Sequence, residues 1–473
     1  MNPDDICFAS ATELAALIRA KKISPVEITD AVLARIERVN PKINAYCTMT
    51  AETAREEARR AEQAVMKARD GGAGLPPLLG VPYSVKDLII TKGVRTMRGS
   101  KIYEHDVPAE DAPIVARMKA AGGVMIGKTT TPEFGWKGMT DSPVTGVTRN
   151  PWNLDRTPGG SSGGASAQIA AGLAPLALGT DGGGSIRIPA GFAGIYGIKA
   201  TFGRVPIYPQ GPFDQLSHAG PMTRTVADAA LMLSVIAGPD PGDRTSLLDP
   251  PGDYPAQLAT GVKGLRIAWS PALGYAQVDP EVARVCAEAA RGFSALGCSV
   301  DEVADPGFGD PTPVFIALWK AGAAGLLGDL LTQWEAHIDP GLVEMVKSGL
   351  KLSALEYARA QVERHRYYDR VRRFFERYDL LLTPTLAVLP FKAGVPFPEK
   401  PAGNGVDWIM WTPFSYPFNL TGMPAATVPA GMSKDGLPVG LQLVAPRGHD
   451  LRVLQASAAF ERARPWAQLR PRL

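Results

Sequence analysis

The sequence predicts an α/β fold in which helices flank a mixed sheet. Helical patterns alternate with short apolar runs, which is typical of layered α/β proteins. The alternation is clearest early in the chain, where a charged, alanine-rich helix at 51–69 precedes a strand at 78–85, a helix at 111–121 and a strand at 123–128. An apolar content of 45% in 473 residues is enough for a large core.

The rest of the chain continues this alternation. Ser, Thr and Pro start signals predict amphipathic helices at 10–20 and 25–38. Residues 238–263 are rich in Pro, Gly and Asp, which predicts a long surface connection. Further helices are expected at 227–237 and 280–296, over most of 311–376, and at 451–463. Further strands are expected at 265–269, 299–303, 380–382, 426–428 and 439–444.

Charge and cysteine usage narrow the function classes. The 50 basic and 47 acidic residues are interspersed, so no basic run indicates binding to nucleic acid or to a membrane. Four scattered cysteines without C-x-x-C spacing predict free thiols in a reducing compartment. The N-terminus lacks the pattern of a signal peptide, and the weakly polar stretch 163–179 is shorter than the roughly 20 residues of a membrane span. We therefore expect a cytoplasmic protein.

Two glycine-flanked serine clusters lie close together, at residues 159–164 and 182–185. Glycine lets the backbone approach a ligand closely because it has no Cβ. Two such clusters, each with a serine, indicate one pocket lined by backbone N–H groups and hydroxyls. This suits acyl transfer, in which a nucleophile attacks a carbonyl and N–H groups hold the oxyanion.

These clusters resemble the signature region of the amidase signature family. The matching segments are Gly80–Asp87, Asn150–Asn153, Pro158–Gly164, Gly179–Arg187, Gly220–Arg224 and Phe418–Pro424. The resemblance covers nearly the whole chain and implies a free-standing bacterial-type amidase. It implies one large domain over residues 1–473, built around a twisted mixed sheet. The signature core would span about 75–235, and helical and loop insertions at 239–420 would shape the substrate pocket.

The resemblance implies a Ser–cis-Ser–Lys triad that forms an acyl-enzyme. Ser185 would be the nucleophile, Ser161 the proton relay after a cis peptide bond, and Lys86 the base. A lysine acts as a base only when neutral, so its surroundings must lower its pKa from about 10.4. The expected oxyanion donors are the N–H groups of Gly182, Gly183, Gly184 and Ser185. The expected supporting residues are Ser162, Asp181 and Arg187.

The expected substrate is a small linear aryl or alkyl amide, and esters and carbamates (urethanes) fit the same chemistry. By resemblance, the loop 134–140 lies beside the pocket, where Trp136 and Met139 would favour apolar groups. Further candidate walls are Phe315, Trp319 and Trp411. The chemistry needs no cofactor, and five scattered histidines without an H-E-x-x-H motif predict no metal site. We expect a monomer or a homodimer.

Other functions stay open. The same triad would serve the glutamine-hydrolysing subunit of a tRNA-dependent amidotransferase, which works inside a complex. A catalytically inactive relative is another alternative, which the intact triad disfavours. Residues 159–163 also fit the G-x-S-x-G elbow of α/β-hydrolases, in which Ser161 would be the nucleophile with a downstream acid and histidine.

Overall fold

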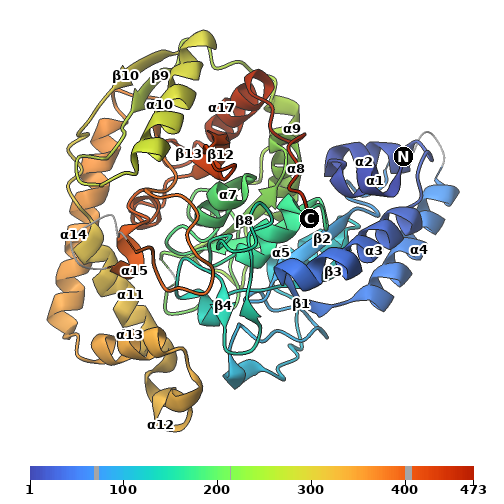
Figure 1. The fold of residues 1–473 in the computed structure, drawn as a ribbon, viewed down its shortest axis with the longest axis horizontal. Helices are drawn as coiled ribbons and strands as arrows, with labels where there is room; N and C mark the ends of the chain where they lie inside the picture. Colours follow the sequence, from blue (N-terminus) through green and yellow to red (C-terminus); the bar gives the residue numbers. More distant parts are fainter. Residues whose placement is uncertain (69–73, 214, 400–406) are drawn as a thin grey trace.

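One sheet contains strands from both halves of the chain. The structure is a computed structural model that describes residues 1–68, 74–213, 215–399 and 407–473. Its main sheet has eleven strands, and Figure 1 shows helices packed around them. The strands are β1 (Tyr46–Met49), β2 (Pro82–Lys86), β3 (Val124–Thr129), β6 (Leu176–Asp181), β7 (Tyr196–Lys199), β8 (His218–Thr223), β9 (Arg266–Trp269), β10 (Ser299–Glu302), β11 (Leu380–Pro384), β12 (Ala425–Met432) and β13 (Pro438–Val444).

The strand order is β1-β3-β2-β6-β8-β7-β12-β13-β11-β9-β10. Strand β2 is parallel to both of its neighbours, β3 and β6. Strand β8 is antiparallel to both β6 and β7. The expected α/β fold with a mixed sheet is therefore confirmed. A separate small hairpin consists of β4 (Asp141–Ser142) and β5 (Gly146–Val147).

Helices cover both faces of the sheet (Figure 1). In the first half of the chain they are α1 (Pro3–Phe8), α2 (Ala11–Arg19), α3 (Pro25–Ile43), α4 (Ala51–Lys67), α5 (Pro113–Ala120), α6 (Gly163–Ala170), α7 (Arg187–Ala193) and α8 (Val226–Ile236). In the second half they are α9 (Tyr254–Gln257), α10 (Pro280–Ala295), α11 (Thr312–Leu327), α12 (Leu331–Trp334), α13 (Pro340–Leu350), α14 (Ala354–Phe374), α15 (Asp407–Met410), α16 (Pro417–Leu420) and α17 (Asp450–Ala463).

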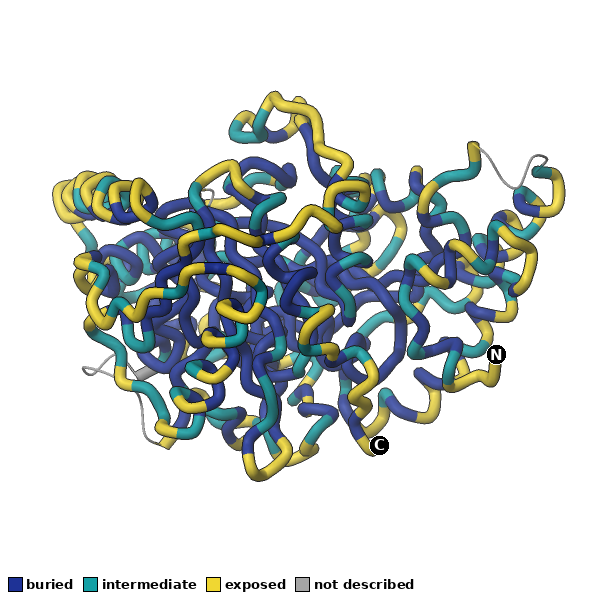
Figure 2. Tube along the Cα trace, turned by 90° about the horizontal axis from the view of Figure 1, so that it is seen from above, coloured by how far each residue is buried: buried dark blue, intermediate teal, exposed yellow. Residues whose placement is uncertain are grey.

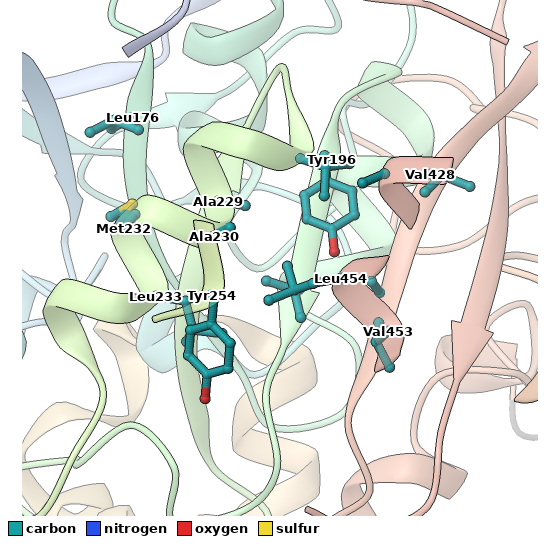
Figure 3. Packing of buried hydrophobic residues seen from close by; sticks show 14 of the residues in the cluster. Leu176, Tyr196, Ala229, Ala230, Met232, Leu233, Tyr254, Val428, Val453 and Leu454 are labelled. Carbon is teal, nitrogen blue, oxygen red and sulfur yellow. The ribbon is translucent and has the colours of Figure 1, made fainter. Parts of the chain in front are cut away.

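Alternate strand residues pack against different helical layers, because successive side chains of a strand point to opposite faces. In β6, Leu176 and Leu178 join the core that includes α5, α8, α10 and α17. Ala177, between them, packs with residues of α6 and α7. Figure 3 shows the first layer, with Ala229 and Ala230 of α8 in the cluster of Tyr196. Figure 2 shows that the buried residues concentrate in the interior.

A second hydrophobic core packs helices of the second half of the chain against the strands β9, β11 and β13. Residues of α11, α13 and α14 pack there with Ala268, Leu381 and Val444 from three strands. In Figure 1 these helices form the orange and yellow group at the lower left. Helix α11 of this layer lies against the second glycine cluster, through Phe315 and Trp319.

Side-chain caps begin several helices, and one of them, Ser10, belongs to the start signals expected for the first two helices. The side chain of Ser10 accepts from Glu13 N at the start of α2, and Asp279 caps α10 in the same way. Helix α14 begins with a capping box in which Ser353 and Glu356 satisfy each other's backbone N–H groups. Such bonds join residues close together in sequence, which explains why the start of α2 could be predicted without tertiary information.

Several elements were not predicted: α1, α7, β1, β7 and β8. Strand β8 contains His218, Gly220 and Pro221, and α7 contains Pro189 and Gly191. These residues weaken any local strand or helix pattern. Helix α7 and strands β7 and β8 form because all of their residues are buried, so tertiary packing overrides their weak propensities.

Among the described residues, one helical stretch, Thr312–His337, is long and apolar enough to cross a membrane by length and composition alone. This stretch was not expected to span a membrane from the sequence. Phe315, Leu318 and Trp319 of this stretch are buried in the core described above. A buried core helix passes the same length and composition test, so packing accounts for the apolar character of α11.

Candidate active site

Lys86 lies where two parallel strands end together. It is the last residue of β2, and Val85 pairs with Leu178 of the neighbouring strand β6. The carboxyl ends of parallel neighbours lie at the same edge of a sheet. Lys86 Nζ is therefore close to the end of β6, 2.9 Å from Thr180 Oγ1, and it also lies 2.6 Å from Ser161 Oγ.

The surroundings of Lys86 favour its neutral form. The side chain is fully buried, and burial lowers the pKa of Lys86 well below its usual value, although nearby Asp181 opposes this. Its contacts named above are hydroxyls rather than carboxylates. A neutral amine in this position can accept a proton from the adjacent serine.

The loop that carries Ser161 is tied to the loop that carries Ser185. The Gly160–Ser161 peptide bond is cis. The backbone N–H of Ser162 donates to Ser185 O at 3.1 Å, and Ser162 Oγ donates to Thr180 O at 3.1 Å. Lys86, Ser161 and Ser185 are thereby brought to one place, with Ser162 as the connection between the two clusters.

Ser185 lies at the turn between β6 and α7. Helix α7 begins at Arg187 with Ile186 as its N-cap residue, so Ser185 is one position too early to serve as the helix cap. The residue is buried but keeps a small exposed fraction of 7%. This placement leaves the hydroxyl available for a role other than capping.

The buried ion pair between Arg187 and Asp181 fixes this turn. Arg187 donates to both carboxylate oxygens of Asp181, from Nε and Nη2, each at 3.0 Å, and both residues are fully buried. The same guanidinium donates to Gln442 Oε1 at 2.8 Å and to Asn419 Oδ1 at 2.6 Å. Burial alone would raise the pKa of Asp181, but the charge and hydrogen bonds of Arg187 hold it well below its usual value. Gln442 and Asn419 were missed by the sequence analysis.

One of the four N–H groups expected to bind an oxyanion is engaged within its own loop. The N–H of Gly184 donates to Asp181 Oδ1 at 2.7 Å. This N–H is therefore engaged within the loop and is not free for a ligand. The candidate donors that this bond leaves are the N–H groups of Gly182, Gly183 and Ser185. Spacing along the chain could not reveal a side-chain acceptor that folds back onto the loop.

Two of the expected wall residues lie directly against the glycine cluster. A Cβ at Gly183 would lie 2.8 Å from Phe315 Cζ, and a Cβ at Gly182 would lie 3.0 Å from Trp319 Cζ3. The two rings stack on each other, with centroids 5.2 Å apart. Only glycine therefore fits at these two positions without displacing an aromatic ring of α11.

The other expected wall residues are placed differently. Trp411 is fully buried and stacks on Phe192 with ring centroids 5.8 Å apart, in a core cluster that includes Met139. Trp136 lines a different cavity of about 590 Å³, together with Trp408. Trp411 and Met139 thus pack as core residues, and the described walls of the cavity beside Trp136 include neither serine of the expected triad.

A second cavity, of about 390 Å³, reaches the site through Thr180, while Lys86, Ser161 and Ser185 are not among its described lining residues. Thr180, whose hydroxyl contacts Lys86, is part of its wall. Phe134 and Phe213 also line it, and Phe213 packs on Trp319 with ring centroids 4.5 Å apart. The loop 134–140 was expected beside the pocket, but the wall residues predicted from it were Trp136 and Met139 rather than Phe134. Phe213 is distant in sequence from both clusters and carried no local signal.

The histidine that comes nearest to this site is engaged elsewhere. His218 Nδ1 lies 2.8 Å from Leu216 O, and its Nε2 lies 3.4 Å from Lys199 Nζ. Among the described residues, no histidine is hydrogen-bonded to Ser161. The α/β-hydrolase elbow, which needs a Ser–His contact at Ser161, therefore has no support in this geometry.

A buried lysine next to a serine, tied to a second serine in a glycine turn, is typical of amidase signature hydrolases. A sequence model of the family described as "Amidase" matches residues 27–454, and the chain belongs to this family. The chain is 40% identical over 481 residues to an acylamidase of Rhodococcus erythropolis, covering 100% of this chain and 98% of that protein.

Other relatives differ in function. The chain is 39% identical over 495 residues to a subunit of the glutamyl-tRNA(Gln) amidotransferase of Moorella thermoacetica, covering 99% of both proteins. Among solved structures, a bacterial aryl acylamidase superposes with a TM-score of 0.90 at 34% identity, covering 98% of this chain and 97% of that one. A 6-aminohexanoate cyclic dimer hydrolase complexed with substrate gives a TM-score of 0.89 at 32% identity, covering 98% and 99%.

Proposed function

We propose that this protein is a free-standing amidase that hydrolyses small linear amides. The observation that carries the proposal is the buried contact of 2.6 Å between Lys86 Nζ and Ser161 Oγ, beside the Ser185 turn. The acylamidase and aryl acylamidase relatives named above support the amide class.

In the proposed mechanism, Lys86, Ser161 and Ser185 form a chain of proton transfer. Neutral Lys86 takes a proton from Ser161, which takes one from Ser185 as Ser185 Oγ attacks the amide carbonyl. The N–H groups of Gly182, Gly183 and Ser185 hold the developing oxyanion. The proton returns through Ser161 to the leaving amine, and water then releases the acid from the acyl-enzyme.

The walls of the site favour apolar aryl or alkyl groups. Phe315 and Trp319 lie over the glycine cluster, and Phe134 and Phe213 line the cavity beside Lys86. Aromatic walls bind apolar substrate groups by burying their surface. Esters and carbamates present a carbonyl of the same geometry, so we include esterase and urethanase activity in the proposal. A carbamate would release an amine, an alcohol and carbon dioxide.

A glutamine-hydrolysing role in a tRNA-dependent amidotransferase is the second candidate. The Moorella relative, at 39% identity, favours it. The aromatic walls fit the polar side chain of glutamine less well than an aryl group. Purification separates the two: a free-standing amidase stays active as a single species, whereas an amidotransferase component requires partner chains.

For the free-standing enzyme we further propose a single domain, a cytoplasmic location, a monomer or homodimer, and no nucleic-acid or membrane partner.

A labelled fluorophosphonate probe tests the assignment of the nucleophile. We expect the probe to attach to Ser185 and Ser185→Ala to abolish anilide turnover, since nothing replaces the nucleophile. Ser161→Ala should cost several orders of magnitude, yet less, because a water molecule partly replaces a relay. The matched control is Ser234→Ala, which removes a remote serine of α8. Attachment of the probe to Ser161 would instead support the elbow alternative.

A further inference from the structure

The cavity beside Lys86 is largely apolar. Its walls include Leu88, Ile90, Phe134, Ile207, Phe213 and Leu326. They come from the segment after β2, from the turn around Phe134, from the loop before β8 and from α11. The volume of about 390 Å³ is within the range of small-molecule pockets, about 300–1,000 Å³.

One positive charge interrupts this apolar wall. Arg98 is the only Asp, Glu, Lys or Arg among the described residues that line the cavity. His218 also lines it, but burial, reinforced by the charge of Lys199, lowers the pKa of His218 well below its usual value. Both effects disfavour the charged imidazole, so Arg98 is the cationic side chain on which the further argument rests.

The guanidinium of Arg98 is held in place from outside the cavity. Its Nη2 donates to Asp106 Oδ2 at 3.1 Å, and Asp106 is not among the described lining residues. The guanidinium carbon lies 3.8 Å from the centre of the Tyr103 ring. Nε and Nη1 make no hydrogen bond to any residue in the described ranges, so they stay available as donors.

The backbone of Arg98 joins the cavity to the proposed catalytic strand. Its N–H donates to Asp87 O at 3.1 Å, directly after Lys86. Its carbonyl accepts from Phe134 N at 2.8 Å. Arg98 thus has a defined position relative both to Lys86 and to the aromatic wall, which a surface arginine on a free loop would lack.

We propose that this cavity takes one arm of the substrate amide and that Arg98 selects arms that end in a carboxylate. This rests on the proposed amidase function. A carboxylate accepts two parallel N–H bonds from a guanidinium, and the geometry of this fork is specific. The hydrocarbon part of the arm packs against Phe134 and Leu326. The substrate class is therefore an amide with a carboxylate at the distal end of one arm.

Two matched substrate pairs test the selection. The first pair is acetanilide and 4-acetamidobenzoate, and the second member carries a carboxylate on the amine arm. The second pair is butyranilide and succinanilate, and the second member carries a carboxylate on the acyl arm. A hydrogen bond to a charged group corresponds to a factor of about 10 to 100. We expect Arg98→Gln to lower the ratio of kcat/KM for charged over neutral substrate by about this factor in one pair, mainly through KM, and Arg98→Lys to lower it less.

Arg95→Gln is the matched control, since it removes an exposed arginine of the same loop that does not belong to the cavity wall. It should leave both ratios unchanged. Ratios that do not respond to Arg98→Gln in either pair would overturn the proposal. So would equal losses for charged and neutral substrates, which would mean that the cavity is merely distorted.

Binding to Ser185→Ala protein separates this inference from the proposed function. By calorimetry, we expect 4-acetamidobenzoate or succinanilate to bind more tightly than its neutral counterpart, and Arg98→Gln to remove that preference. Ser185-dependent turnover without any effect of Arg98 would defeat the inference alone. Arg98-dependent binding without any anilide turnover would defeat the proposed function alone.

Discussion

The charge state of Lys86 is decided by the atoms around its amine. Its nearest polar partners are two hydroxyls, which can accept from either form of the amine and can donate to the neutral form. Full burial then disfavours the ammonium form. The same lysine on the surface would be protonated at neutral pH and could not act as a base.

This perturbation has a cost in stability with a definite sign. The pKa of Lys86 is lowered in the folded protein, so between the folded and unfolded pKa values the unfolded chain binds the additional proton. Stability contributed by this residue therefore rises with pH across that window. At neutral pH the neutral, buried lysine makes the folded state less stable than it would be at alkaline pH.

Lys86→Met should abolish activity and flatten this pH dependence. We expect the stability of wild type, relative to the variant, to increase as pH rises from 7 toward 10, because only wild type carries the perturbed amine. Urea unfolding across this pH range measures the difference. The matched control is Lys92→Met, an exposed lysine of the loop after β2. A difference that stays constant with pH would contradict the lowered pKa.

At the scale of elements, the turn between β6 and α7 is held by one buried ion pair. Asp181 closes the turn from within by accepting from Gly184 N and Ile186 N. Arg187 links it to Gln442 of β13 and to Asn419 of α16. The turn that carries Ser185 is thus fixed by strands and helices that are more than 200 residues away in sequence.

Arg187→Met should destabilise the protein by about 3–5 kcal/mol at neutral pH, because it leaves the Asp181 carboxylate buried and unpaired. The lowered pKa of Asp181 means that its stabilising effect is present above its unfolded pKa of about 3.9 and is lost as pH falls. The deficit should therefore shrink toward acid pH, as measured by urea unfolding.

Arg187→Lys is the matched comparison at this position. Lysine keeps the charge but cannot reproduce the forked contacts to Asp181, Asn419 and Gln442. We expect it to restore only part of the stability and to leave low activity. Full recovery with lysine would show that charge alone, without the fork, holds the turn.

At the scale of the whole molecule, the sheet joins the two halves of the chain. Strand β7 pairs with β12 through Ala425–Lys199 and Ala426–Ile198. Strand β11 lies between β13 and β9, so it too sits inside the sheet. Neither half of the chain can complete the site's supporting network without the other.

The fragment 1–237 should therefore not fold alone. It would expose the edge of β7 and leave Arg187 without its partners in the second half. We expect it to be protease-sensitive and to gain resistance when it is co-expressed with 238–473. Limited proteolysis and circular dichroism measure this. Cooperative unfolding of the isolated fragment would show instead that the first half is a domain of its own.

The sequence by itself determined which residue types are present and the local structure around them. The glycine–serine clusters, the apolar run before Lys86 and the helix caps are written in short segments, where neighbours along the chain decide the outcome. Strands β7 and β8 could not be predicted, because Gly, Pro and His obscure their pattern and only pairing within the sheet forms them.

The tertiary structure alone decided how these residues interact. Distances between separate segments decide three contacts of the site: Thr180 with Lys86, Asp181 with the N–H of Gly184, and Asn419 with Arg187. The position of Arg98 in the cavity wall also depends on the tertiary structure. Burial, pKa and the availability of an N–H donor arise from atoms that surround a group in space, and a linear pattern does not contain them.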